Sequence, residues 1–390
     1  MVTPILALNQ LGTESAFEVL ARANMLMKQG QEIINLGIGQ PDFRTPHHIV
    51  EAAIKALRDG HHGYTAANGL QELREAVSED IKTYRGVTID PDLVMIVPGG
   101  KVTMYFAIMM FGEKGSEILY PNPGFPIYES LIRFFGATPI PMPLYENTGY
   151  AFDADEVLSL ITKKSRLLIL NSPSNPTGGI VPKKQIDKLI NGLSSFPNLC
   201  ILSDEIYSRM LYDGKKHISL LQYEHLHDRL IILDGWSKTF SMTGWRLGYG
   251  IWPKNLIDHA NRLAINCHSC VNTASQFAGI AALKGSQIPV SKMMGEFEKR
   301  RKLIVRELNQ IPGLKCPNPG GAFYVFPNIK DTGFTSAEFQ DMCLTQAGVA
   351  TIAGTSFGHL GEGYMRFSYA NSTQNIVKAI EKIKNLLKSL

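Results

Sequence analysis

The chain has 390 residues, of which 44% are hydrophobic and 19% charged, and its formal net charge is +4. This composition excludes a disordered chain, and the mixed acids and bases leave no basic, aromatic-interleaved stretch of the kind that binds nucleic acid. The apolar runs fall far short of the roughly 20 residues of a membrane span and residues 1–8 lack the basic start of a secretory signal, so we expect a cytoplasmic protein without nucleic-acid or membrane partners.

The first part of the chain predicts helices around one short strand. A capping box, Ser15-x-x-Glu18, begins the first helix, and Thr45-Pro46 supplies the N-cap and first position of the second. Glycines close both helices. The helical stretches run over 15–30, 46–60 and 70–84, with an apolar strand over 33–36.

The middle of the chain alternates apolar strands with helical or loop stretches. The strand-like runs cover 93–97, 117–120, 167–170, 199–202 and 230–233. Continuous Ile, Leu and Val runs are typical of a parallel sheet covered on both faces. Asn171, Asp204 and the pair Ser237-Lys238 each follow the end of such a run, and functional groups of parallel sheets gather at that edge.

The composition changes near residue 291. A charged helix over 296–310, a strand over 320–326 after a glycine turn, and an amphipathic helix over 374–390 follow. We therefore expect an α/β protein of two domains. The large domain, 46–290, has a mostly parallel sheet flanked by helices, and residues 1–45 and 291–390 form a smaller α+β domain.

The five cysteines are odd in number and form no disulfide framework. Cys267 and Cys270 make a C-x-x-C pair around His268, which leaves a redox or metal role open, but no second pair completes a zinc site. At a spacing of three residues the two thiols would share one helix face. We expect reduced, buried structural thiols and no metal.

Lys238 has the most informative surroundings. A lysine against the end of an apolar sheet is usually neutralised, paired or covalently used. Ser237 before it and Arg246 after it are suited to a phosphate. A lysine with a phosphate clamp is what pyridoxal phosphate requires, because its aldehyde forms a Schiff base with lysine. For these residues alone, a solvated lysine on a glycine-rich loop remains the alternative.

Two further segments fit the same cofactor. Asn175, in a Pro- and Gly-fixed turn, can donate to a phenolic oxygen, and Tyr207 can donate to the same atom. Asp204 at a sheet edge needs a cationic partner, and a protonated pyridine nitrogen is one. Taken singly, the asparagine segment also reads as a simple turn and Asp204 as a helix cap.

Together and in this order, the motifs resemble those of the class I aminotransferases of pyridoxal phosphate fold type I, and more narrowly their gamma-type branch of aspartate and neutral amino acid enzymes. The matching motifs extend over nearly the whole chain. They are Gly39-x-Pro41-Asp42-Phe43, Gly63-Tyr64-Thr65, Asn175-Pro176-Thr177-Gly178, Asp204-Glu205-x-Tyr207, Ser237-Lys238-x-Phe240-x-Met242-x-Gly244-x-Arg246-x-Gly248, Gly320-Gly321-Ala322-Phe323-Tyr324 and Arg366-Phe367-Ser368.

The resemblance implies the cofactor contacts. Lys238 would carry the cofactor as a Schiff base and move the substrate proton, Asp204 would pair with the pyridine nitrogen, and Asn175 and Tyr207 would hold the phenolic oxygen. Phe125 would stack on the ring. The phosphate would be bound by Ser237, Arg246 and the backbone N–H groups of Gly99, Gly100 and Lys101 at a helix start.

The resemblance also implies substrates and partners. Arg366, with the Gly39 backbone and Asn175, would bind the α-carboxylate of an amino acid. Tyr64 would reach the phosphate of a neighbouring subunit, so a homodimer with composite sites is expected. The implied reaction moves an amino group from an L-amino acid to a 2-oxo acid in a ping-pong cycle.

Other functions remain as alternatives. A C–S β-lyase or related elimination enzyme would use the same Lys238 and Asp204. A pyridoxal phosphate-sensing regulator needs a DNA-binding segment for which the stretch before residue 33 is too short, and a nicotinamide site lacks its G-x-G-x-x-G. Phe125 replaces the tryptophan of aspartate-preferring relatives, and Ser15 is kept beside a bulky Phe17, so neutral or aromatic substrates stay open.

Overall fold

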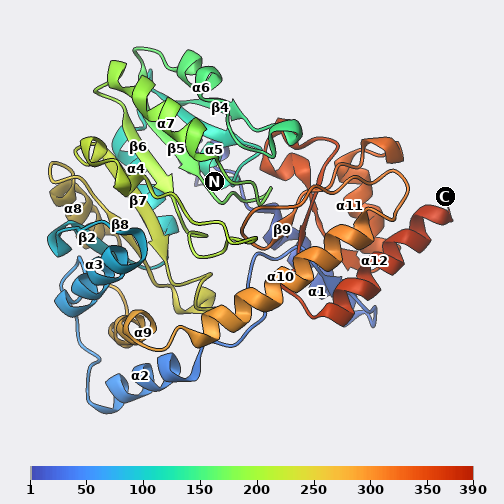
Figure 1. The fold of residues 1–390 in the computed structure, drawn as a ribbon, viewed down its shortest axis with the longest axis horizontal. Helices are drawn as coiled ribbons and strands as arrows, with labels where there is room; N and C mark the ends of the chain where they lie inside the picture. Colours follow the sequence, from blue (N-terminus) through green and yellow to red (C-terminus); the bar gives the residue numbers. More distant parts are fainter. Residues whose placement is uncertain (1, 390) are drawn as a thin grey trace.

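A seven-stranded sheet forms the larger part of the molecule in the computed structural model, which describes residues 2–389 (Figure 1). The strand order is β2-β8-β7-β6-β5-β3-β4, and all neighbours are parallel except β8, which is antiparallel to β2 and β7. The strands are β2 (Val94–Val97), β3 (Glu117–Asn122), β4 (Thr138–Pro143), β5 (Ser165–Asn171), β6 (Cys200–Asp204), β7 (Leu230–Gly235) and β8 (Gly248–Ile251). The α/β class and the mostly parallel sheet are confirmed.

Helices cover both faces of this sheet, and they connect most of its parallel strands. The helices of the whole chain are α1 (Ser15–Lys28), α2 (His47–Arg58), α3 (Gln71–Arg85), α4 (Lys101–Phe111), α5 (Ile127–Phe134), α6 (Ala154–Leu160), α7 (Lys183–Gly192), α8 (Ile257–His268), α9 (Thr273–Lys284), α10 (Ile288–Leu308), α11 (Ser336–Thr345) and α12 (Thr373–Lys388).

The continuous apolar strands serve two cores at once. Leu167 and Ile169 of β5 pack with α4, α5 and α8 on one face, whereas Leu168 and Leu170 pack with the helices of the other face. Because successive side chains of a strand alternate between faces, both sets must be apolar when both faces are covered. This is why the strands could be recognised as uninterrupted Ile/Leu/Val runs.

The two ends of the chain meet in the second lobe. β1 (Ile34–Asn35) pairs in parallel with β10 (Val349–Ala350), and β12 (Met365–Ser368) lies between β11 (Ile352–Ala353) and β9 (Tyr324–Val325) in an antiparallel sheet. α10 runs from the large lobe along this one (Figure 1). The expected domain boundary at 291 falls inside α10.

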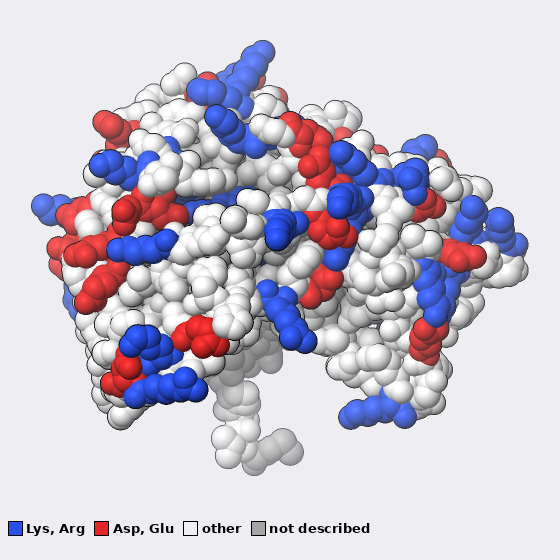
Figure 2. Space-filling model, turned by 60° about the horizontal axis from the view of Figure 1, so that its bottom comes forward, with Lys and Arg blue, Asp and Glu red and all other residues white. Residues whose placement is uncertain are grey.

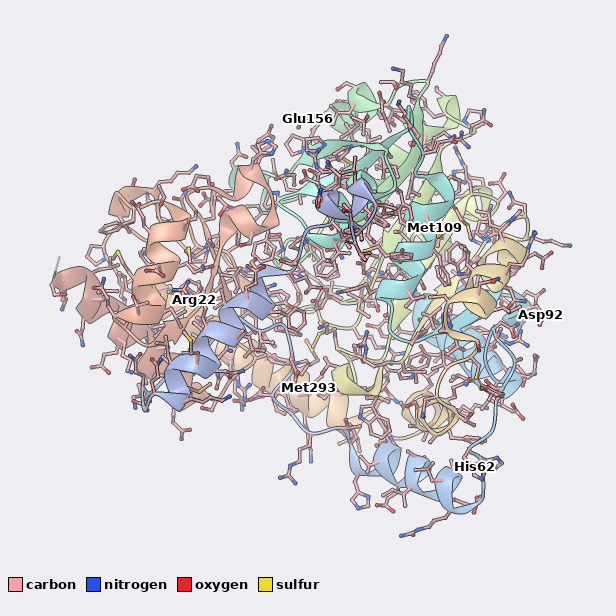
Figure 3. The ribbon with its side chains drawn as sticks, turned by 180° about the vertical axis from the view of Figure 1, so that it is seen from behind. Arg22, His62, Asp92, Met109, Glu156 and Met293 are labelled. Carbon is pink, nitrogen blue, oxygen red and sulfur yellow. The ribbon has the colours of Figure 1, made fainter. Side chains whose placement is uncertain are left out.

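α1 also belongs to this second lobe by contact. Seen from behind, the helix that carries Arg22 lies against the C-terminal part of the chain (Figure 3). Arg22 Nη2 pairs with Asp341 Oδ1 of α11 at 2.5 Å. The segment before α1 instead reaches the large lobe, since the N–H of Gly12 donates to Ser130 Oγ of α5 at 2.8 Å.

Several local expectations were wrong. Ser15 is the first residue of α1 rather than its cap, which is Glu14, and Glu18 accepts from Thr13 Oγ1 instead of closing a capping box. Thr45 is not the cap of α2 either, because its hydroxyl donates to the carbonyl of Ser241 at 2.8 Å. Both hydroxyl-bearing residues were read as caps from local spacing alone.

The cysteine pair was also misread. α8 ends at His268, so Cys270 lies beyond the helix and is half-buried, while Cys267 is exposed. The strand expected over 320–326 is reduced to Tyr324–Val325, because its glycine-containing start forms a turn instead. α10 begins at Ile288, well before the expected charged stretch.

The surface agrees with the mixed charge pattern of the chain. On the face drawn in Figure 2, acidic and basic side chains are interspersed across both lobes. Within residues 2–389, no helix combines the length and the apolar character needed to cross a membrane.

Candidate active site

A cavity of about 500 Å³ lies at the carboxyl edge of the parallel strands, where the two lobes meet. Eleven of the thirteen residues singled out from the sequence line it: Gly39, Gly100, Lys101, Phe125, Asn175, Asp204, Tyr207, Ser237, Lys238, Arg246 and Arg366. Gly99 and Tyr64 do not. The strand ends bring the set together, because β5, β6 and β7 are parallel neighbours that finish at the same edge.

Lys238 lies just beyond β7, and its ammonium group is enclosed. Nζ donates to the carbonyl of Gly39 at 2.6 Å, which joins the two lobes across the cavity. Burial lowers the pKa of Lys238 to about 8, and the Arg366 guanidinium acts in the same direction. A fraction of this amine is therefore neutral near neutral pH, as a nucleophile or base must be.

Asp204 ends β6 and is 5% exposed. Its Oδ2 accepts from the hydroxyl of Tyr128 at 2.7 Å, and its Oδ1 accepts from the N–H of Ile206 at 3.2 Å. Burial raises its pKa to about 6, although both hydrogen bonds oppose the shift. Since these partners are neutral, the carboxylate is suited to a cationic group placed in the cavity.

Asn175 and Tyr207 face the cavity beside this carboxylate. The side-chain carbonyl of Asn175 is taken by Arg366, whose Nη1 donates to it at 2.9 Å. The amide NH₂ of Asn175 is then the group left to donate to a ligand. The Tyr207 hydroxyl lies 2.9 Å from that of Tyr324, and burial raises the pKa of Tyr207, so it stays protonated as a donor.

Arg366 approaches from β12 of the second lobe and is 3% exposed. It donates to the neutral oxygens of Asn175 and Gly37, while its Nε is buried without a partner. Its guanidinium also lies 4.6 Å from the ring centroid of Tyr324. Burial lowers the pKa of Arg366, because a buried cation without an anionic partner is unfavourable. A ligand carboxylate would supply that anion.

The opposite end of the cavity is shaped for a phosphate. Gly100 is the N-cap of α4, so the backbone N–H groups of Gly100 and Lys101 remain for an anion, whereas those of Val102 and Thr103 donate to the carbonyls of Gly99 and Gly100. A Cβ on Gly99 would lie 2.1 Å from Nη2 of Arg246, and Gly99 has φ +90°. Only glycine permits this approach of the guanidinium to the turn. Ser237 lines the same cavity.

The two aromatic residues predicted to contact the cofactor differ in position. Phe125 forms a wall of the cavity, with its ring packed edge-on against Tyr128 at 5.8 Å between centroids. Tyr64 is 92% exposed and lies outside the cavity of its own chain. Its expected contact with a neighbouring subunit stays a prediction.

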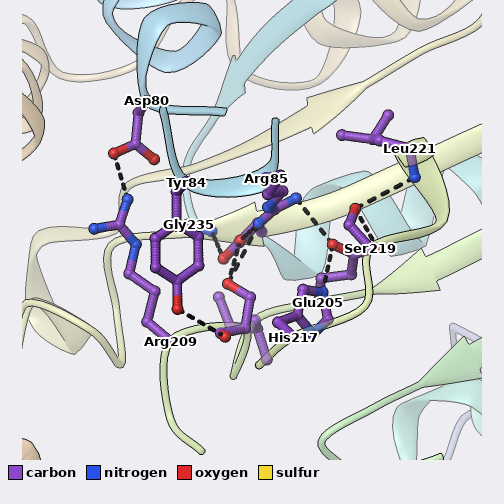
Figure 4. Close-up of polar contacts among 12 residues, drawn as sticks. Asp80, Tyr84, Arg85, Glu205, Arg209, His217, Ser219, Leu221 and Gly235 are labelled. Atoms are coloured by element: carbon purple, nitrogen blue, oxygen red, sulfur yellow. Dashed lines mark hydrogen bonds and ion pairs between the residues drawn. The ribbon is translucent and has the colours of Figure 1, made fainter. Parts of the chain in front are cut away.

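A buried charge network is centred on Arg85 and Glu205, the residue that follows Asp204 in the chain (Figure 4). Arg85, at the end of α3, pairs with Glu205 at 2.9 Å and with Asp234 of β7. His217 Nε2 lies 2.8 Å from the same Glu205 carboxylate. Burial acts to raise the pKa of Glu205, but Arg85 and His217 lower it to about 2. The network therefore fixes the segment after β6 to the strand that leads to Lys238.

Three ionisable residues of the cavity, Glu14, Tyr128 and Tyr324, were not among the predicted site residues. Tyr128 lies in the first turn of α5, only three positions after Phe125, so its closeness in sequence to a predicted residue was a usable signal. Tyr324 is the last residue of the Gly320-Gly321-Ala322-Phe323-Tyr324 motif, from which no role was predicted for it. Glu14 directly precedes Ser15, at which the capping-box pattern places the helix start.

The comparisons with known proteins agree with this geometry. A family model described as "Aminotransferase class I and II" matches residues 31–383. The chain belongs to the class I and II aminotransferases. It is 37% identical to an aspartate aminotransferase of Pyrococcus abyssi, with 92% of each chain covered, and 38% identical to aromatic-amino-acid aminotransferase 2 of Thermococcus litoralis, covering 93% of this chain and 94% of that one.

A solved structure extends the likeness to the fold. Alanine aminotransferase from Pyrococcus furiosus superimposes with a TM-score of 0.91 at 32% identity, and the match covers all of both chains. The protein is a pyridoxal phosphate-dependent aminotransferase, as the resemblance of its motifs implied. The C–S β-lyase alternative is not favoured.

The residues present fit the cofactor of this class. The buried Asp204 has neutral partners only, the free amide of Asn175 faces the cavity, and the Gly99 cradle admits Arg246. Pyridoxal phosphate has a basic ring nitrogen, a phenolic oxygen and a phosphate, and it bonds to lysine. Each of these groups thus has a complementary group in the cavity.

Proposed function

We propose that this aminotransferase transfers the amino group of an L-amino acid to a 2-oxo acid in two half-reactions at the described cavity, with Lys238 as the reacting amine. The observation that carries the proposal is the half-buried Lys238, whose pKa is lowered to about 8, in the same cavity as Asp204 and Arg366. Bound pyridoxal phosphate would withdraw electrons from the substrate α-carbon, and Asp204 would sustain this by keeping the ring nitrogen protonated.

The chain's own residues would then perform distinct tasks. Arg366 would bind the α-carboxylate through its two-pronged guanidinium, and this fixes the α-carbon relative to Lys238. Lys238 Nζ would take up the α-proton and release it again, because its lowered pKa leaves it partly neutral. Asn175 and Tyr207 would donate to the phenolic oxygen, while Ser237, Arg246 and the Gly99–Lys101 turn would hold the phosphate.

We further propose that the enzyme is a homodimer in which Tyr64 completes the partner's site. Its 92% exposure and its place outside its own cavity support this role. Mixing Tyr64→Ala and Lys238→Ala chains under subunit exchange should restore activity that neither variant has, since one site per mixed dimer regains both residues. Absence of recovery despite exchange would exclude composite sites. We place the enzyme in the cytoplasm, which its five free cysteines support.

The assignment of Lys238 is tested by trapping the cofactor. Borohydride reduction of the holoenzyme should fix pyridoxal phosphate on the peptide that contains Lys238, as read by mass spectrometry. Lys238→Ala should abolish the adduct, whereas Lys254→Ala, a change at an exposed lysine, should leave it unchanged. An adduct on another lysine of the wild-type enzyme would overturn the assignment.

A further inference from the structure

One pair of charges in the cavity has no task in the proposed reaction. Arg246 and Asp204 face the cofactor, and Lys238 and Arg366 face the reacting end of the substrate. The lining also includes Glu14 and Lys101. The backbone of Lys101 belongs to the phosphate turn, but its side chain is separate from that role.

These two side chains form an ion pair across the lobes. Glu14 Oε1 accepts from Nζ of Lys101, although 87 positions separate them. The Glu14 side chain is only 17% exposed, whereas that of Lys101 is 45% exposed. Nζ of Lys101 also lies 5.3 Å from the ring centroid of Phe125, which places the pair beside the wall where the cofactor ring is expected.

The position of Glu14 is fixed by the backbone around it. It caps α1, and its carbonyl accepts from the N–H of Phe17 at 2.9 Å. Gly12, just before it, is bonded to Ser130 of α5 in both directions, at 2.8 and 3.3 Å. The carboxylate is therefore presented to the cavity by a segment held at both ends.

The ion pair sets the net charge next to a bound substrate side chain, because Glu14 neutralises Lys101. A second carboxylate on the substrate could use Lys101, but it would have to displace Glu14 and leave that partly buried carboxylate unpaired beside a like charge. The cavity lining also includes the apolar side chains of Phe17, Ile38 and Phe357. An uncharged side chain can pack against these groups while the ion pair stays intact.

We propose that Glu14 is a specificity-determining residue that neutralises Lys101 and makes this cavity a site for amino acids with apolar or aromatic side chains rather than dicarboxylic ones. The inference rests on the proposed transamination and names its donor class. Through space, the same carboxylate faces the reacting group, since it acts to raise the pKa of Lys238 against the effects of burial and Arg366.

The test compares half-reactions of holoenzyme with single amino acids, followed by the absorbance of the bound cofactor after rapid mixing. Wild-type enzyme should convert L-phenylalanine with a kcat/KM at least about tenfold above that for L-aspartate. Glu14→Gln should lower this ratio about tenfold or more, because Lys101 is then free to bind the second carboxylate. Adding Lys101→Met to that variant should remove the gain with aspartate.

A matched control is available on the same helix. Glu18→Gln removes a carboxylate that bonds to Thr13 and does not line the cavity, so the ratio should stay as in wild type. A ratio unchanged in Glu14→Gln, or L-ornithine as the best wild-type donor, would overturn the role of Glu14. Failure of every amino acid to react would instead refute the proposed transamination, so the two failures are distinguishable.

Discussion

The hydrogen bond from Tyr128 to Asp204 allows a quantitative prediction. The pKa of Asp204 rises from 3.8 to about 6 in the folded chain, which corresponds to about 3 kcal/mol. Because the folded pKa is raised, this carboxyl stabilises the apo-protein below pH 3.8 and loses that contribution as pH rises through about 6. Above that pH, the buried anion depends on its two donors.

Tyr128→Phe removes the stronger of these donors. A hydrogen bond to a charged group contributes about 1.5–3 kcal/mol, against about 0.5–1.5 for a neutral pair. The substitution should therefore cost about 1–2 kcal/mol more at about pH 8 than at about pH 5, and raise the pKa of Asp204 by about one unit. At low pH, where Asp204 is protonated, the lost unfolding free energy reflects only a hydrogen bond between neutral groups and the missing hydroxyl.

Denaturant unfolding of the apo-protein measures this difference. Tyr128→Phe is compared at both pH values, at one protein concentration, in the Asp204 background and in an Asp204→Asn background. In the asparagine background the cost should not depend on pH, since no carboxylate titrates there. The reasoning is refuted if the cost in the aspartate background is equally independent of pH, or if both backgrounds show the same dependence.

Arg366→Lys should raise KM about tenfold or more for every α-amino acid donor, because a point charge cannot replace the two-pronged contact; steady-state kinetics with unchanged KM would contradict this. Gly99→Ala should weaken pyridoxal phosphate binding in titrations of the apo-protein, since its Cβ would lie 2.1 Å from Arg246, while Gly115→Ala, at a similar φ in open space, should not. Arg85→Met should cost about 3–5 kcal/mol of unfolding free energy, because two buried carboxylates lose their cation; a loss below about 1 kcal/mol would show that the network contributes little.

The sequence predicted the parts of the fold that depend on local pattern. Apolar runs located five strands of the sheet, and the polar residues after three of them do line one cavity. Two strands escaped detection for physical reasons. β4 contains three prolines, which only its place at the sheet edge tolerates, and β8 is rich in glycine, which is uncommon in strands.

The missed features of the site depend on distant contacts. Thr45 was read as a cap, but its hydroxyl bonds to Ser241, which no local spacing reveals. The role proposed for Glu14 depends on its ion pair with Lys101, which belongs to the other lobe. The free amide of Asn175 likewise follows from the use of its carbonyl by Arg366. Such pairings are set by tertiary packing, so a single sequence offers no direct signal for them.

The Arg85 network supports the reacting centre and not the part of the cavity that contacts the substrate side chain. By joining Glu205 to Asp234, it ties the end of β6, which carries Asp204, to β7, the strand that leads to Lys238. The groups that meet a substrate side chain, such as Glu14, come largely from outside these two strands. Mutations can therefore alter what the enzyme accepts without disturbing its reacting centre. A scaffold of this kind can diversify its donors, as its relatives named for aspartate, aromatic amino acids and alanine have done.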